Sequence, residues 1–206
     1  LVGSEMCIRD SRWVQQANGR RMPYVDGAFA TVFSNSVLEH IPDPAPVLWE
    51  DGRVLRAGGR FIFTVPSDAF PRLLHGYQVR LAEGDREGAE RYAAQVDARL
   101  AHHHYHTPEE WADLLAAAGL TMEKARYYIP EPVERLWDRM NGRFGIGRWS
   151  PWRLVASPRL RPLGAWRLLR RWVVARLGRA WRRWYEMDVH PKQKGGGLLV
   201  VAQKVG

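Results

Sequence analysis

The chain has 206 residues, of which 46% are hydrophobic and 26% are charged, and this is enough apolar material for one globular domain with a buried core. It contains no apolar run near the roughly 20 residues that cross a bilayer, and its single cysteine, Cys7, excludes both an internal disulfide framework and a zinc site built from cysteines. The net charge of +9 is localised, because twelve arginines and no acidic residue lie between Arg139 and Tyr185. These features indicate a cytoplasmic protein with one basic segment.

The first third of the chain alternates between strand and helix signals. Strands are expected at residues 12–18, 30–35 and 60–65, and a helix is expected over residues 43–56, ended by Gly58-Gly59. The run 60–65, "RFIFTV", is continuously apolar, which is typical of a strand buried on both faces. Strand, helix and strand at this spacing predict one βαβ unit of a parallel sheet.

Helical signals dominate the middle of the chain. Residues 70–101 are predicted to be helical, because apolar side chains recur at helical spacing toward the end of that stretch. The clearest local prediction is a helix within "HTPEEWADLLAAAGL", with Thr107 as N-cap, Glu110 completing a capping box and Gly119 just past its end. Strands are expected at 121–129 and at 198–204, the latter after a flexible glycine triplet at 195–197.

Residues 22–67 combine an "MPY" turn, the strand "ATVFSN", the sequence "VLEH", the helix end "RVLRAGG" and a buried strand. In this order they resemble the second half of a class I S-adenosylmethionine-dependent methyltransferase of the type-11 family. The resemblance is weaker in the capped helix and the last strand, and it covers residues 12–129 and 195–206. It departs from the family pattern at Ala30, Gly52 and Ala57, none of which supplies a group that the chemistry needs.

The resemblance implies an α/β fold, namely a Rossmann-like class I methyltransferase sheet that lacks its first two strands and carries a helical insertion before the last strand. The family's glycine-rich turn and its ribose-binding acidic residue would precede residue 12. We therefore expect half a cofactor site, with little or no S-adenosylmethionine binding and impaired activity in this 206-residue chain. The start, "LVGSEMCIRDS", resembles translated sequencing-adapter sequence, so we interpret residues 1–11 as non-native and expect the natural chain to extend upstream of Arg12.

Four segments are predicted on this basis: residues 1–11, which are adapter-derived; 12–129, the C-terminal part of the methyltransferase domain with a helical insertion at 68–106; 130–194, a basic Trp/Arg-rich helical insertion or lid; and 195–206, the final strand.

Position relative to the family pattern also implies the site residues. The expected cofactor-binding residues are Asn18, Ser34, Asn35, Ser36 and Leu38, with Asn18 accepting from the adenine amino group and Leu38 packing beneath the methionine part. A base is needed only if the acceptor must lose a proton, and His40 and His106 are the candidates. We predict no metal site, because the run "HHHYH" at 102–106 has no partner carboxylate at helical spacing.

The basic segment carries an apolar stripe. Its members are Trp166, Leu169, Val173, Leu177, Ala180 and Trp184. This pattern is typical of an interfacial helix, so residues 163–185 are a candidate for peripheral contact with the inner face of an anionic membrane. The alternative is a lid that packs the stripe over the methyltransferase pocket. Trp137, Trp149 and Trp152 are expected in the apolar wall of that pocket.

The function predicted from the sequence is methyl transfer from S-adenosylmethionine to a small acceptor that is hydrophobic, lipid-like or close to a membrane. The alternative is a non-catalytic protein that binds a membrane or nucleic acid through the basic segment. Nucleic acid is the less favoured partner, because the aromatic residues lie on the stripe and not among the arginines.

Overall fold

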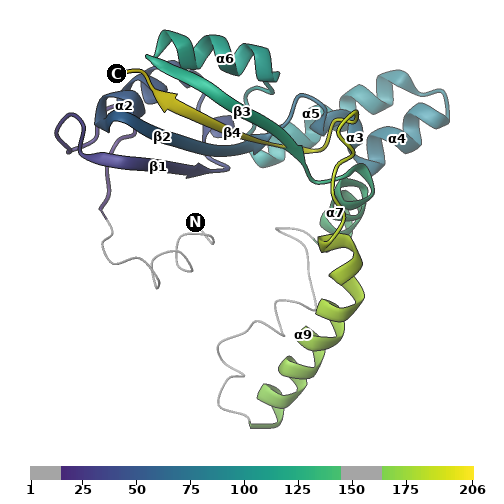
Figure 1. The fold of residues 1–206 in the computed structure, drawn as a ribbon. Coiled ribbons are helices and arrows are strands. Elements are labelled where there is room, and N and C mark those ends of the chain that lie inside the picture. Colours follow the sequence, from purple (N-terminus) through teal and green to yellow (C-terminus); the bar gives the residue numbers. More distant parts are fainter. Residues whose placement is uncertain (1–14, 145–163) are drawn as a thin grey trace.

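The computed structural model of the chain describes residues 15–144 and 164–206 (Figure 1). Its elements are, in chain order, β1 (Phe29–Asn35), the 3-10 turn η1 (Leu38–His40), α2 (Ala45–Val54), β2 (Leu55–Pro66), α3 (Phe70–Leu73), α4 (His75–Ala82), α5 (Arg86–Leu100), α6 (Pro108–Ala117), β3 (Leu120–Tyr128), α7 (Glu131–Phe144), α9 (Gly164–Tyr185) and β4 (Gly197–Lys204).

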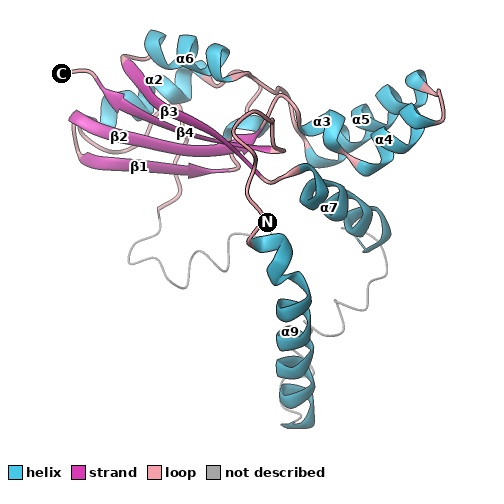
Figure 2. Cartoon of the chain, turned by 45° about the vertical axis from the view of Figure 1, so that its right-hand side comes forward, coloured by secondary structure: helices cyan, strands magenta, loops and turns pink. Residues whose placement is uncertain are grey.

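The four strands form one sheet in the order β1-β2-β4-β3. β1 and β2 are parallel and are joined through α2, which confirms the predicted βαβ unit. β4 is antiparallel to both β2 and β3, so the last strand of the chain lies between two earlier ones. This arrangement brings the carboxyl ends of β1, β2 and β3 to the same edge of the sheet as the start of β4 (Figure 2).

Two hydrophobic clusters hold these elements together. The first lies between the sheet and the helices α2 and α6, where the ring of Trp111 meets that of Phe63 edge-on at 5.0 Å and Leu48 is fully buried. The second joins α3, α4 and α5 around Leu74 and Val96, beyond the carboxyl-end edge of the sheet (Figure 1). The predicted helical insertion is therefore a small helical layer with its own core.

The helix after residue 107 forms as predicted. Thr107 Oγ1 accepts from the N–H of Glu110 at 3.2 Å, and the Glu110 carboxylate accepts from the N–H of Thr107 at 2.8 Å, which completes the capping box. Gly119 follows with a φ of +74°, a conformation in which a side chain is strained. The strands expected at 30–35, 60–65, 121–129 and 198–204 are also confirmed.

Two local expectations were wrong, namely a strand at residues 12–18, of which the structure describes 15–18, and a helix ended by Gly58-Gly59. Residues 15–18 form no strand, because their one sheet-like pairing is an isolated bridge between Asn18 and Arg21. The helix α2 ends at Val54, and Gly58-Gly59 lie inside β2 at an irregularity in its pairing with β1. A Cβ on Gly59 would lie 2.8 Å from a backbone oxygen, so close strand packing, and not a helix stop, requires glycine there.

The helical stretch 70–101 is divided in the structure. The longest helix within it, α5, begins after Gly84, whose φ is +81°. The carboxylate of Asp85 caps α5 by accepting from the N–H of Gly88 at 2.8 Å. The apolar periodicity was real, but a left-handed glycine followed by a new N-cap separates α4 from α5.

Residues 130–194, predicted to be an insertion, include two described helices, α7 and α9, with different positions. α7 lies against the helical layer, whereas α9 projects away from the sheet and meets α7 only near its own C-terminal end (Figures 1 and 2). On the predicted stripe, Val173, Leu177 and Trp184 are half-buried while Ala180 is exposed. Trp149 and Trp152 lie outside the described residues. Among the helices that the structure describes, none combines the length and apolar character of a membrane span.

Candidate functional site

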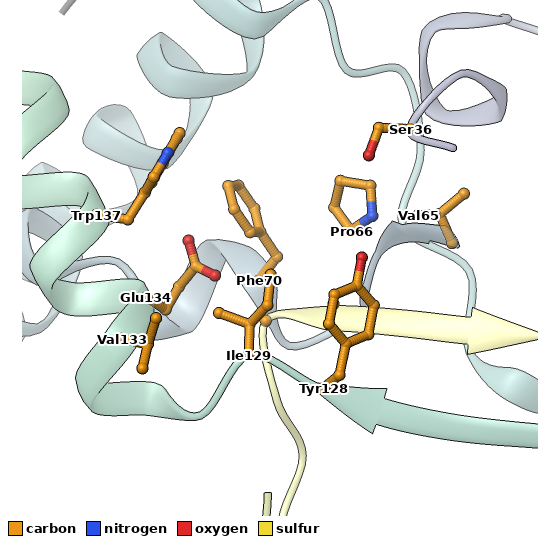
Figure 3. Close-up of a pocket in the computed structure, with 11 residues that line it drawn as sticks. Ser36, Val65, Pro66, Phe70, Tyr128, Ile129, Val133, Glu134 and Trp137 are labelled. Atoms are coloured by element: carbon orange, nitrogen blue, oxygen red, sulfur yellow. The ribbon is translucent and has the colours of Figure 1, made fainter. Parts of the chain in front are cut away.

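A cavity of about 220 Å³ opens at the edge where β1 and β2 end. Ser36 comes from the end of β1, Tyr128 from the end of β3 and Gly196 from the approach to β4, while Glu134 and Trp137 come from α7 (Figure 3). We call this space the Glu134 cavity. Apart from Glu134 its wall is largely apolar, and Trp137 belongs to it as the sequence predicted.

The segment predicted to bind the cofactor leads directly into this cavity. Ser36 has a φ of +51°, and its N–H donates to the carbonyl oxygen of Thr64 at 2.9 Å, which turns the chain sharply at the strand end. The side-chain oxygen of Asn35 accepts from the hydroxyl of Thr64 at 2.5 Å. Ser34 lies within β1, and Leu38 is 1% exposed, in the core just beyond the turn. The structure therefore brings Ser36 to the cavity, with Leu38 supporting the turn from inside.

Asn18 lies apart from the strands, in an exposed turn. Its side-chain oxygen accepts from the N–H of Arg20 at 3.0 Å, and its carbonyl accepts from the N–H of Arg21 at 2.9 Å. The adjacent Gly19 packs near Val47 in the first turn of α2, which follows the carboxyl end of β1. Asn18 therefore lies in a local turn and not at the end of a strand.

Glu134 supplies a carboxyl group to the cavity, and sequence reasoning missed it. Figure 3 shows its carboxylate between Trp137 and Phe70, and the residue is 2% exposed. Burial, together with a smaller effect of the nearby Asp138, raises the pKa of this carboxyl to about 7. At neutral pH Glu134 is therefore divided between a hydrogen-bond-donating acid and a proton-accepting carboxylate. A signal existed in the sequence, since Glu134 and Asp138 share one helix face.

The backbone at Gly196, which lies against Glu134, is fixed by hydrogen bonds. A Cβ on Gly196 would lie 2.1 Å from Glu134 Oε2, so any larger residue there would displace the carboxylate. The N–H of Gly196 donates to the carbonyl of Ile129 at 2.8 Å, and its own carbonyl accepts from the N–H of Ser67 at 2.9 Å. The glycine triplet predicted to be flexible is therefore a tightly bonded part of the cavity wall. Burial also raises the pKa of the Tyr128 hydroxyl, which keeps that group a hydrogen-bond donor.

Two wall residues have a strained backbone. Ser36 and the β-branched Ile129 both have positive φ, at +51° and +63°, and only one other non-glycine residue among the described residues does so, Ala101 at +57°. Such conformations persist where the surrounding structure imposes them, and they concentrate at functional sites. Both Ser36 and Ile129 line the Glu134 cavity.

His40 does not line the cavity. It lies in η1, where its Nδ1 is 3.0 Å from the carbonyl oxygen of Ala101 and its Nε2 is 3.8 Å from the carboxylate of Glu39. The neighbouring Glu39 is 2% exposed, and burial raises the pKa of its carboxyl. His102 packs against His40 with 5.2 Å between ring centroids, and burial lowers the pKa of His102 to about 4.

His106 lies in a different group, at the start of α6. Its ring stacks on that of His104 at 4.4 Å and meets Trp111 edge-on at 5.0 Å. Its Nδ1 is 3.6 Å from the carboxylate of Glu110, the capping-box residue. His106 is therefore packed beside the helix N-terminus and does not belong to the wall of the Glu134 cavity.

Comparison with known proteins explains this arrangement. A model of the family described as a methyltransferase domain matches residues 4–63. The sarcosine/dimethylglycine N-methyltransferase of Halorhodospira halochloris is 52% identical over 48 residues, which are 23% of this chain and 17% of that protein. The crystal structure of a putative sarcosine dimethylglycine methyltransferase from Galdieria sulphuraria is 14% identical, with a TM-score of 0.51 over 99% of this chain and 63% of its own.

The chain has the fold of a class I methyltransferase. The resemblance first seen in residues 22–67 is thereby confirmed, as is the Rossmann-like α/β fold class. A geranyl diphosphate methyltransferase solved with S-adenosylmethionine also matches, with 16% identity and a TM-score of 0.50 over 99% of this chain and 62% of that one. This chain spans less than two thirds of the length of these solved relatives.

Proposed function

We propose that the protein transfers a methyl group from S-adenosylmethionine to a small, largely apolar acceptor held in the Glu134 cavity. The observation that carries the proposal is the position of this cavity. It opens at the carboxyl ends of parallel strands in a methyltransferase fold, and the carboxyl group of Glu134 lies in its largely apolar wall.

The residues at the end of β1 fit the donor. Ser36 turns its backbone and hydroxyl toward the cavity, and the opposite wall has no side chain at Gly196. Ser34, Asn35 and Ser36 would hold the methionine part, Leu38 would support them from the core, and Asn18 would accept from the adenine amino group. S-adenosylmethionine, when bound, supplies an electrophilic methyl group on a sulfonium centre.

The remaining chemistry is assigned to the wall of the cavity. A nucleophile that carries a proton must lose it on methylation, and Glu134, with its pKa raised to about 7, can accept that proton near neutral pH. Phe70 and Trp137 exclude water from the reacting groups, and the Tyr128 hydroxyl can orient the acceptor. We assign the base role to Glu134, because neither His40 nor His106 lines the cavity.

The chemistry of the wall favours an amine acceptor. Glu134 places a carboxyl group in this wall, and the nearby Asp138, which accepts from Gly76 and Tyr92, adds negative charge outside it, so a cationic or partly cationic nitrogen is favoured beside Glu134. The local sequence match to an N-methyltransferase points the same way. A primary or secondary amine attached to an apolar body of modest size would use both the carboxyl group and the apolar wall.

We also propose that α9 makes peripheral contact with an anionic membrane. Two tryptophans of its described part are exposed, Trp172 at 60% and Trp181 at 45%, and exposed arginines lie on the same helix. Tryptophan suits the headgroup level, and arginine suits anionic lipid. Vesicles containing phosphatidylserine should sediment the protein at low salt, and Trp172→Ala with Trp181→Ala should weaken this. Equal sedimentation with neutral vesicles would contradict the charge argument.

The catalytic proposal is tested by transfer of a radiolabelled methyl group from S-adenosylmethionine to a panel of apolar amines and alcohols. The assay uses both the 206-residue chain and the protein expressed from its complete gene. We expect at least one of the two to methylate an amine, and Glu134→Gln to lower kcat about 100-fold or more by removing the base. The proposal fails if neither protein transfers the label, and the base assignment fails if Glu134→Gln is fully active.

A further inference from the structure

Outside the Glu134 cavity, three side chains with metal-binding atoms meet between η1 and the segment that follows α5. They are Glu39, His40 and His102, and one potential ligand atom from each lies within 4.8 Å of the others. The sequence offered no such group, because the carboxylate lies more than sixty residues away from the histidine run in the chain. In the folded protein, Glu39 supplies the carboxylate that is missing at helical spacing within the histidine run 102–106.

Glu39 provides the first indication of a ligand. Its side chain is 2% exposed, and Oε2 has no hydrogen-bond partner. The other oxygen is 3.8 Å from His40 Nε2, which is too long for a hydrogen bond. An unpartnered carboxylate oxygen inside a protein is costly unless a cation or a donor meets it.

The hydrogen bonds of the two histidines provide the second indication. His40 Nδ1 lies 3.0 Å from a carbonyl oxygen, that of Ala101, and since a carbonyl only accepts, this nitrogen carries the hydrogen. His102 Nδ1 lies 2.8 Å from the hydroxyl of Tyr105, which itself donates to the carboxylate of Asp97. His102 Nδ1 must therefore donate as well. Each neutral ring consequently has its lone pair on Nε2.

These hydrogen bonds are the outer contacts that orient metal-binding imidazoles in known sites, where the second ring nitrogen donates to a carbonyl or to a polar side chain. Two imidazole nitrogens and one carboxylate oxygen suit zinc and similar divalent cations, and they leave a fourth position open. Ligand atoms around tetrahedral zinc are about 3.3 Å apart, so the group needs only a modest contraction. His40, which is 42% exposed, can make that movement.

We propose that Glu39, His40 and His102 form a binding site for a divalent transition-metal cation of the zinc class. The cation joins η1, which carries Leu38 beneath the strand-end turn, to the segment between α5 and α6. Phe70 lies between the two sites, since its ring is 5.6 Å from that of His102 and it also lines the Glu134 cavity. The ring of Phe70 thus separates the metal site from the Glu134 cavity, and the proposed cation takes no part in methyl transfer.

Zinc binding to the metal-free 206-residue chain tests the proposal. Affinity is measured by competition with a chromogenic chelator, and stoichiometry by elemental analysis. We expect one zinc ion per chain, an affinity at least about 100-fold lower in Glu39→Gln and His40→Ala, and an affinity about 10-fold lower in Tyr105→Phe, which removes only an outer contact. His103→Ala is the matched control, because His103 is an exposed histidine of the same run outside the group.

Cobalt(II) is the second probe, and it requires no variant. A tetrahedral or five-coordinate site gives the wild-type chain an intense visible absorption, which an equimolar amount of zinc should abolish. Far-UV circular dichroism shows whether each variant is folded. The proposal is wrong if wild type binds no stoichiometric zinc, if its cobalt spectrum is that of the hydrated ion, or if His103→Ala lowers affinity as much as His40→Ala.

Discussion

Replacing Glu134 by glutamine should stabilise the protein in a pH-dependent manner. Burial raises the pKa of this carboxyl from its ordinary value of 4.5 to about 7, with a further contribution from Asp138. Each tenfold change in proton affinity corresponds to about 1.4 kcal/mol, so the raised pKa corresponds to about 3 kcal/mol. The side chain is 2% exposed, and solvent screening therefore reduces this value little.

The sign follows from proton counting. Between pH 4.5 and about pH 7 the folded protein keeps the Glu134 proton while the unfolded chain has lost it, so stability falls as the pH rises through this range. Below pH 4.5 both states are protonated, and the full stability is present. Glutamine keeps the shape of the side chain but does not ionise. Glu134→Gln should therefore match wild type near pH 4.5 and exceed it by up to about 3 kcal/mol at pH 8.

Urea unfolding at pH 4.5 and pH 8 measures this difference. With a denaturant slope of about 2 kcal/mol per molar, the midpoint of the variant should lie about 1–2 M above that of wild type at pH 8 only. Asp51, whose pKa burial also raises to about 7, is present in both proteins and cancels. The exposed Glu109→Gln is the control and should shift neither midpoint. Equal midpoints at pH 8, or the same shift at both pH values, would refute the reasoning.

Three further predictions concern the cavity and the fold. Thr107→Ala removes the hydroxyl that accepts from the N–H of Glu110 and should lower the free energy of unfolding by about 1 kcal/mol, measured by urea denaturation at pH 7. Gly196→Ala places a Cβ 2.1 Å from Glu134 Oε2 and should cost about 1–3 kcal/mol in the same assay, whereas unchanged stability would show that the carboxylate moves freely. Tyr128→Phe should raise KM for the amine acceptor about 5-fold with little change in kcat, and an unchanged KM would exclude an orienting hydrogen bond.

Local signals predicted the elements whose determinants are close in sequence. The capping box at Thr107 and the left-handed Gly119 correctly predicted where α6 begins and ends, because each depends on contacts within one turn. The continuous apolar run at 60–65 likewise predicted a buried strand, and the run is in β2. The turn at Gly84 was missed, since a single positive φ interrupts a helical pattern without disturbing its periodicity.

Among the predicted site residues, the structure places at the cavity only Ser36, which lies within the family resemblance of residues 22–67. Ser36 was expected at a strand end and lies at the cavity, whereas the histidines expected to reach the substrate pack elsewhere. Asn18 was assigned to a strand that the structure lacks. Residue type at a position indicates what a side chain can do, but the direction in which it points depends on neighbours that are distant in the chain.

The sequence alone determined the βαβ unit and the methyltransferase resemblance, because periodicity, capping and glycine placement act over a few residues. Only the tertiary structure decided that Glu134 would face the strand-end turn at Ser36 and that Glu39 would meet His102. The first pairing joins α7 to the end of β1 and the second joins η1 to the segment after α5, so each brings together segments separated by more than sixty residues. Burial then raised the pKa of Glu134, and burial is a property of the folded chain that composition and spacing do not contain.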